Sequence, residues 1–231
     1  MGNDFSTSPI YRDDEDQLDF VYTISTSKIV KYLLNPTFPD DPIRAEFGKL
    51  MEEGYQHVCY LLKIKGWQSL LMYDCESLEE FIEEEIYMYL EEHSELLRED
   101  ELEEGQEIAK VFFQHGVCGL TPKTRVREAF KSHFVFAKAD LRSEYGTLYE
   151  FKTYPINEYA ELQAKIFSWV YNEPVHLVGW DGDKIEEVVL NSVNINFKNI
   201  PNEFWEIEPL QMLLSYSKPF IREYGYYRTF L

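Results

Sequence analysis

The run of residues 140–152 constrains the fold more than any other part of the chain, because it predicts a β-hairpin. Residues two apart on a strand share a face, so Glu150 and Lys152 point the same way. With the turn centred near Tyr145, Asp140 lies across from Glu150. The sequence therefore predicts two carboxylates and a lysine side by side.

Two interpretations of this charged cluster stay open. In the first, it is a solvated hairpin face that also places Lys138 across from Lys152, with cross-strand ion pairs worth roughly 0–1 kcal/mol each. In the second, a divalent cation with oxygen ligands lies between two carboxylates that would otherwise repel each other. The second is favoured by Phe134, Phe136, Leu148 and Tyr154, which continue the parity of the charged residues and put them at the rim of a buried face. The opposite face of the hairpin is predicted to be apolar and consists of Ala137, Ala139, Leu141, Tyr149, Phe151 and Thr153.

The formal charge of −20 disfavours contact with nucleic acid, because neutralisation of phosphates supplies most non-specific affinity. The charge is unevenly distributed. Fourteen acidic residues and a single basic one, Arg98, lie between Glu76 and Glu104, which predicts a solvated acidic helix or a surface for a basic protein partner. Basic residues gather just before and within the hairpin: Lys123, Arg125, Arg127, Lys131, Lys138 and Arg142.

Length and composition predict one domain. Residues 1–18 are polar and acidic and are expected to be disordered, whereas residues 19–231 of a chain that is 45% hydrophobic suffice for a single core. No apolar run approaches the roughly 20 residues of a membrane span, and no signal peptide precedes the fold, so we expect a cytoplasmic protein. The three cysteines predict buried apolar thiols, without a disulfide framework or an iron–sulfur cluster.

Hydrophobic spacing and capping residues predict the secondary structure. The order helix, strand, strand, helix, strand indicates an α/β domain with a central mixed β-sheet flanked by helices. Helices are expected within 25–35, from Pro42 to Gly66, from Ser77 to Leu97, from Asn157 to Tyr171 and over 209–216, strands over 175–180 and 184–190, and either type over 106–115.

The motifs around the hairpin resemble those of the PD-(D/E)XK nuclease superfamily. Asp140, the run Glu150-Phe151-Lys152 and Gln163 match its D, E-x-K and Q-x-x-x-Y motifs, with Phe167 in place of the tyrosine. Upstream, residues 24–28 and 48–52 are similar to the S-x-S and G-x-x-x-H elements of the RecB-like branch, which includes CRISPR-associated exonucleases. Archaeal Holliday junction resolvase-like members are the near alternative.

The resemblance implies a restriction-endonuclease-like core with an extra acidic helical segment, and a metal site on it. Asp140, Glu150 and the main-chain carbonyl of Phe151 would hold one or two Mg²⁺ or Mn²⁺ ions. Glu52 stands where the RecB-like pattern has histidine and would complete the site. Lys152 and Gln163 would be catalytic, orienting the attacking water or stabilising charge. Alternatives to Glu52 are Glu53, Glu46 and His57.

The expected function is therefore a metal-dependent DNA nuclease, either an exonuclease or an endonuclease that cuts branched DNA as a homodimer. The six basic residues around the hairpin would bind the DNA backbone without reading sequence. The alternative is a non-catalytic acidic interaction protein with a nuclease-like fold, which binds a basic partner or mimics DNA.

Overall fold

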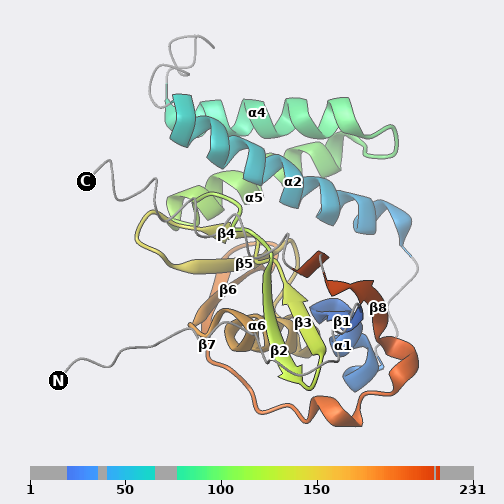
Figure 1. Ribbon diagram of the computed structural model, residues 1–231. Helices are drawn as coiled ribbons and strands as arrows, with labels where there is room; N and C mark the ends of the chain where they lie inside the picture. The colour runs from blue at the N-terminus through green and yellow to red at the C-terminus, as the bar shows by residue number, and fades with distance from the viewer. Residues whose placement is uncertain (1–19, 36–40, 66–76, 211, 214–231) are drawn as a thin grey trace, which may run out of the picture.

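The fold consists of five helices and eight strands in the part of the chain that the structure, a computed structural model, describes: residues 20–35, 41–65, 77–210 and 212–213 (Figure 1). The helices are α1 (Thr26–Leu34), α2 (Pro42–Lys65), α4 (Leu78–His93), α5 (Glu99–Gln114) and α6 (Glu158–Tyr171). The strands are β1 (Phe20–Ser25), β2 (Arg125–Phe130), β3 (His133–Ala137), β4 (Leu141–Arg142), β5 (Leu148–Lys152), β6 (Val175–Trp180), β7 (Ile185–Leu190) and β8 (Glu206–Pro209).

The strands form two mixed sheets. The first has the order β2-β3-β1-β8, with β1 parallel to β3, and the second has the order β4-β5-β6-β7, with β5 parallel to β6. Helices flank both sheets, which confirms the expected α/β class. The prediction of a single central sheet was wrong. Strand β3 pairs with β1 and β2 in the first sheet, and the chain then leaves that sheet before β4 pairs with β5 in the second.

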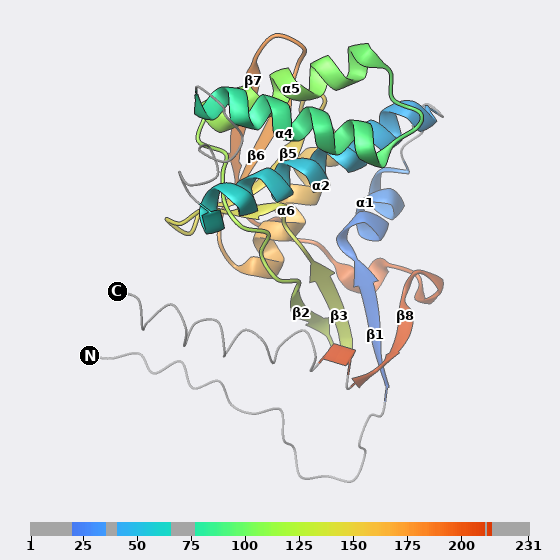
Figure 2. The ribbon, with the colours of Figure 1, turned by 90° about the horizontal axis from the view of Figure 1, so that it is seen from above.

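The second sheet is covered on both faces. Helices α2, α4 and α5 group on one side of the molecule, and the first sheet lies on the other (Figures 1 and 2). Tyr149 and Phe151 of β5 pack in the core with α2, α4 and α5, whereas Leu148 packs in the core that contains α6. Ala137 and Ala139 belong to the α6 core and Leu141 to the other, so the single buried hairpin face expected from the sequence is divided between two cores.

Capping residues explain several helix boundaries. Ser25, Ser77 and Asn157 each accept a hydrogen bond from the backbone N–H three residues later, which fixes the starts of α1, α4 and α6. Asn35 and Asn172 end α1 and α6 in the left-handed conformation. These helices confirm the sequence prediction.

Other predictions of the elements need correction. The helix expected to continue to Leu97 ends at His93, and α5 begins at Glu99, where Arg98 and Glu101 form a reciprocal cap. The ambiguous segment 106–115 is helical up to Gln114. Pro209 ends β8, and the backbone of Leu210, Met212 and Leu213 is helical, which agrees with the helix predicted over 209–216 from its second residue; residues 211 and 214–216 lie outside the described residues. Strands β1, β2 and β8 were not predicted.

Two further predictions concern the whole chain. The expected tail, residues 1–18, lies outside the described residues, and the single domain over residues 19–231 stays a prediction. Within the described ranges, no helix combines the length and the apolar character that a membrane crossing requires.

Candidate active site

The β4–β5 connection brings the predicted carboxylates together. Leu141 pairs with Tyr149 and Arg142 with Leu148, as the predicted register requires, and Asp140 directly precedes the first of these pairs. The turn lies at residues 144–145, and the φ of Gly146 is +88°, a conformation that favours glycine. Asp140 therefore lies at the bend where the chain passes from one sheet to the other.

Asp140 and Glu150 are both almost fully buried, with exposed fractions of 4% and 2%. Asp140 Oδ2 accepts a hydrogen bond of 2.9 Å from the backbone N–H of Phe151. Lys152 Nζ donates to Glu150 Oε1 at 2.5 Å. The second oxygen, Glu150 Oε2, is buried and has no hydrogen-bond partner within the described part of the chain. A buried carboxylate oxygen without a partner is costly, which makes it a candidate ligand atom.

Burial and mutual repulsion raise the pKa values of the two carboxyl groups, and the Lys152 ammonium opposes this effect. Burial, followed by the charges of Glu150 and Glu52, raises the pKa of Asp140 well above its ordinary value. Burial also raises the pKa of Glu150, although Lys152 opposes this effect. Burial lowers the pKa of Lys152, but the two carboxylates outweigh it and raise that pKa, so the side chain remains an ammonium ion at neutral pH.

Helix α2 supplies a third carboxylate, Glu52. Its charge raises the pKa of both Asp140 and Glu150, and its Oε1 accepts a hydrogen bond of 3.2 Å from Gln56. Glu52 lines a pocket of about 220 Å³ that also contains Lys152. Gly48 also lines this pocket, and a Cβ on it would make an ordinary contact of 3.5 Å with Thr153 Oγ1.

The alternatives to Glu52 have other contacts. Glu53 Oε1 lies 3.9 Å from Lys49 Nζ, and Glu46 accepts a hydrogen bond of 2.8 Å from Ser94. The ring of His57 packs 5.7 Å from that of Tyr89. Of the four helix candidates, Glu52 is the one that lines the pocket beside Lys152.

The start of helix α6 approaches the cluster through Tyr159. The charges of Lys152 and Glu150 affect the pKa of Tyr159, and Ser27 of α1 hydrogen-bonds its hydroxyl. Gln163 is half-buried and follows Tyr159 by four residues, so both lie on one face of the helix. Phe167, at the position where the family pattern has tyrosine, is buried in the core.

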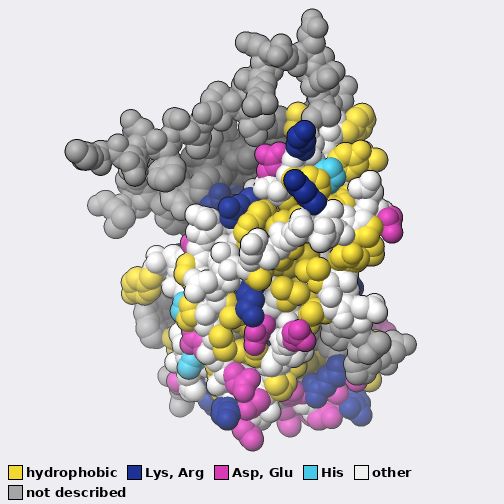
Figure 3. Space-filling view, turned by 90° about the horizontal axis from the view of Figure 1, so that it is seen from below, with side chains coloured by type: hydrophobic (Ala, Val, Ile, Leu, Met, Phe, Trp, Pro, Cys, Tyr) yellow, Lys and Arg dark blue, Asp and Glu magenta, His cyan; other side chains and the backbone are white. Residues whose placement is uncertain are grey.

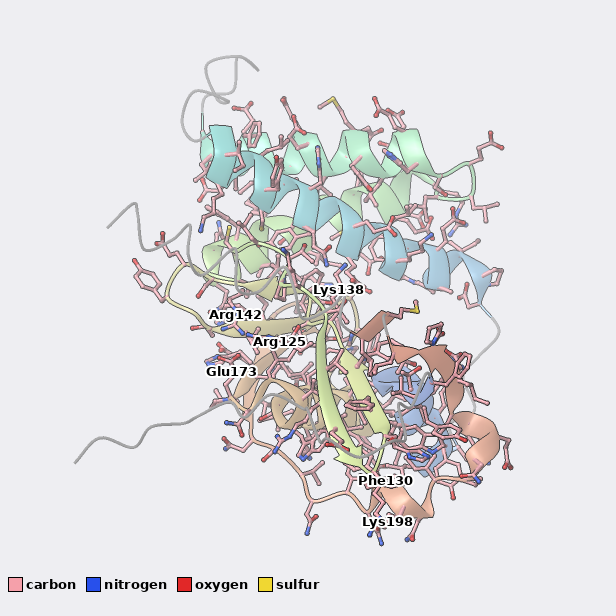
Figure 4. The ribbon with its side chains drawn as sticks, in the orientation of Figure 1. Arg125, Phe130, Lys138, Arg142, Glu173 and Lys198 are labelled. Atoms are coloured by element: carbon pink, nitrogen blue, oxygen red, sulfur yellow. The ribbon has the colours of Figure 1, made fainter. Side chains whose placement is uncertain are left out.

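The predicted basic residues have different environments in the fold. Figure 4 shows Arg125, Lys138 and Arg142 in the region near the upper end of the β2–β3 pair, with Glu173 on the side of Arg142. Arg127 donates to the Trp169 carbonyl and stacks on that ring at 4.4 Å, and Arg142 forms an ion pair with Glu173. These two guanidinium groups hold the fold together instead of forming an open patch.

The remaining basic residues lie at the two ends of the β2–β3 pair. The register joins Arg125 to Ala137, which puts Lys123, Arg125 and Lys138 at one end and Lys131, in the turn, at the other. Lys138 is exposed and two residues from Asp140, but no sheet pairing joins it to Lys152 as the sequence had predicted.

Arg44 and Tyr154 line the pocket and were not predicted from the sequence as residues that do so. Arg44 lies four residues before Gly48 and eight before Glu52 on α2, a spacing that would have placed it on one face with them. Tyr154 lies two residues after the end of β5 and also lines the pocket. Its pKa is raised, chiefly by burial, so the hydroxyl remains a donor.

The chemistry of these donors suits a hard divalent cation, although no three Asp, Glu, His or Cys side chains of the described residues are grouped closely enough to form a ready-made ligand set. Asp140, Glu150 and Glu52 supply carboxylate oxygens, one of them buried without a partner, and Mg²⁺ and Mn²⁺ prefer such ligands. The Phe151 carbonyl, the remaining predicted ligand, lies between Glu150 and Lys152 in β5.

Comparison with known proteins adds little. No family model and no curated protein matches the chain. Among solved structures, the chain is similar to one described as "Crystal structure of SSO0001", with 13% sequence identity over 79% of this chain and 72% of that chain and a TM-score of 0.33. A likeness this weak bears on neither fold nor function.

Proposed function

We propose that this protein is a metal-dependent DNA nuclease that hydrolyses phosphodiester bonds. The observation that carries the proposal is the buried pair of Asp140 and Glu150, with one Glu150 oxygen lacking a hydrogen-bond partner in the described residues and with Lys152 on the other. Burying two carboxylates side by side is unfavourable, and such pairs are typical of sites that bind a cation or catalyse a reaction.

Three carboxylates and the Phe151 carbonyl would hold one or two Mg²⁺ or Mn²⁺ ions. Such an ion lowers the pKa of a bound water and neutralises charge on the phosphate. Lys152 remains protonated beside Glu150, which suits it to donate hydrogen bonds to the scissile phosphate and excludes it as the base. Tyr154, which lines the pocket beside Lys152, is suited to position water or substrate, and Gln163 on α6 would have the same role by the family resemblance.

A restriction-endonuclease-like core is part of the proposal. It is supported by the order of the elements: the β4–β5 hairpin carries Asp140, Glu150 and Lys152 at its open end, α6 crosses over, and β6 returns parallel to β5. This order agrees with the family pattern of D, E-x-K and glutamine helix, and it sets the carboxylates at the edge of a sheet covered by α2.

The DNA would approach along α2 and the end of the β2–β3 pair. Lys49 is exposed and lines the pocket, and Lys138 is exposed near Asp140. These two lysines are better suited to contact phosphates than Arg44, Arg127 and Arg142, whose guanidinium groups are held by protein partners.

The second candidate is a non-catalytic acidic interaction protein. It is favoured by the solvent-exposed acids of α4, α5 and their connection, which would bind a basic protein or mimic DNA. They are Glu79, Glu84, Glu91, Glu92, Glu95, Glu99, Asp100, Glu103 and Glu107. This candidate gives no reason for the buried Asp140–Glu150 pair.

The test is cleavage of labelled single-stranded, duplex and four-way-junction DNA with Mg²⁺, Mn²⁺ or EDTA. We expect metal-dependent cleavage that Asp140→Asn and Lys152→Met abolish, while the exposed controls Asp183→Asn and Lys198→Met keep the wild-type rate. Cleavage that survives in Asp140→Asn, or none on any substrate, would reject the nuclease. Pull-down of a basic protein by the intact chain, lost on reversing the charges of α4, would then favour the second candidate.

A further inference from the structure

Two of the three cysteines meet at the junction between α2 and the segment that follows α5. The thiol of Cys59, on α2, is fully buried and hydrogen-bonds that of Cys118, which is half-buried. The sequence had predicted separate apolar thiols, because 58 residues lie between them. The fold makes them neighbours.

The backbone on both sides of this pair is fixed. Tyr55 lies one helical turn before Cys59, and its hydroxyl donates a hydrogen bond of 2.5 Å to the carbonyl of Val117, the residue before Cys118. On the other side, a Cβ on Gly119 would lie 2.2 Å from the Arg142 carbonyl oxygen, so this glycine allows a close backbone approach. Leu120 then exchanges two hydrogen bonds with Arg142. The contact between the thiols therefore belongs to a rigid part of the molecule.

The two thiols have different chemical characters. The hydrogen bond from Cys59, together with the Gly119 N–H and the charge of Lys63, lowers the pKa of Cys118, although burial opposes this effect. The hydrogen bond with Cys118 and burial raise the pKa of Cys59 well above its ordinary value. A half-buried thiol that ionises readily, beside a buried one that does not, suits an attacking and a resolving cysteine.

We propose that Cys59 and Cys118 form a reversible intramolecular disulfide by exchange with a low-molecular-weight disulfide such as oxidised glutathione. The Cys118 thiolate attacks one glutathione sulfur, and the other glutathione leaves as a thiolate that takes up a proton. Cys59 then loses its proton and attacks Cys118 Sγ, which releases the second glutathione. The protein loses two hydrogens and two electrons, and one glutathione disulfide becomes two thiols.

The disulfide would link the elements that carry two of the carboxylates. Glu52 lies seven residues before Cys59 on α2, and Asp140 lies two residues before Arg142, the partner of Leu120. The bond would close a loop of about 60 residues and so restrict the unfolded chain. It does not depend on the proposed nuclease, because the argument uses neither the metal nor the DNA.

The test uses the full chain with Cys75, which lies outside the described residues, replaced by serine. Incubation of native Cys75→Ser with oxidised glutathione should reduce its free thiols from two to none, leave no bound glutathione, and raise the melting temperature by roughly 10 °C. A reductant should reverse both changes. A peptide map without reduction should join Cys59 to Cys118.

The matched variant is Cys75→Ser with Cys118→Ser, whose melting temperature should not respond to the oxidant. Two thiols that persist in the folded protein would overturn the proposal, and so would a stable glutathione adduct on Cys118 or a disulfide between two molecules. If the double variant does not fold, the peptide map and the thiol count of Cys75→Ser alone still decide the question.

Discussion

At the scale of single residues, Asp140 determines how the cluster responds to pH. Its folded pKa is raised above the ordinary value of 3.8, first by burial and then by Glu150 and Glu52. A carboxyl whose pKa is higher in the folded protein than in the unfolded chain stabilises the fold at pH values below the pKa of the unfolded chain. This stabilisation is lost as the pH rises through the pKa of the folded protein. The metal-free protein therefore carries a destabilising group at neutral pH.

Asp140→Asn should stabilise the metal-free protein. The amide oxygen can still accept the Phe151 N–H, and the unfavourable buried charge is removed. In EDTA at pH 7 we expect the free energy of unfolding to rise by about 1–2 kcal/mol, and the gain to vanish below about pH 4. Urea denaturation measures it, with exposed Asp183→Asn as the control. A less stable Asp140→Asn at pH 7 would contradict this electrostatic interpretation.

The three charged residues of the cluster could be predicted from the sequence for a physical reason. Alternation along a strand and the position of Gly146 fix the register, so Asp140, Glu150 and Lys152 follow from local rules. The contact of Arg127 with Trp169 was not predicted, because the two residues lie 42 positions apart and no local pattern indicates such a contact.

At the scale of elements, the start of α5 depends on one ion pair. Glu101 accepts hydrogen bonds from the backbone N–H of Arg98 at 3.0 Å and from its guanidinium at 2.9 Å. The Arg98 side chain and backbone lower the pKa of Glu101 to about 2 from 4.5. A carboxyl whose pKa is lower in the folded protein stabilises the fold at pH values above its pKa in the unfolded chain. This stabilisation is lost as the pH falls from 4.5 toward 2.

Glu101→Gln should therefore lower the melting temperature at pH 6–7, because the charged cap of α5 is lost. Scanning calorimetry between pH 2 and 7 measures the difference from the wild type, which should narrow steadily below pH 4.5. Glu103→Gln, an exposed neighbour, is the control. A difference that stays constant across this range would show that the charge of Glu101 does not contribute.

The contact between residue 119 and β4 gives a steric prediction. Gly119→Ala should destabilise the fold by about 1–3 kcal/mol, because the added Cβ would collide with the Arg142 backbone at 2.2 Å. Gly48→Ala is the matched control: its Cβ has ordinary contacts inside α2, so it should be neutral or stabilising by up to about 1 kcal/mol. Urea denaturation measures the free energy of unfolding of both variants. Equal changes in the two would contradict the close approach of Gly119 to the Arg142 backbone.

Helices were easier to predict than the sheets. Ser77 and Asn157 mark helix starts through interactions within three residues. Strand β1 pairs with β3 and β8 across more than 100 residues, and β8 follows two short 3-10 turns, Phe197–Asn199 and Asn202–Phe204. Such pairing depends on tertiary packing, which explains why the first sheet was missed.

At the scale of the whole molecule, the outer surface of α4 and α5 differs from that of the paired strands β1 and β8. The exposed acids gather on α4 and α5, whereas Phe20, Tyr22 and Ile207 expose an apolar strip on the paired strands β1 and β8. Figure 3 shows that hydrophobic side chains also gather on the face seen from below, among scattered charges. The strip is the surface we expect for the predicted homodimer.

Ile207→Lys should convert the dimer into a monomer, because it places a charge in the centre of that strip. Light scattering with size exclusion measures the mass. Val189→Lys, at a similarly exposed hydrophobic residue on β7, should stay dimeric. A wild-type protein that is monomeric, or a dimer unaffected by Ile207→Lys, would reject this interface.

The central claim is that Asp140, Glu150 and Glu52 form a metal centre, and calorimetric titration with Mn²⁺ tests it most directly. We expect the wild type to bind one or two ions and to release protons in doing so, because carboxyls with raised pKa values must ionise. Glu150→Gln should lose this binding, and exposed Glu103→Gln should keep it. Absence of binding by the wild type, or equal binding by Glu150→Gln, would contradict the account.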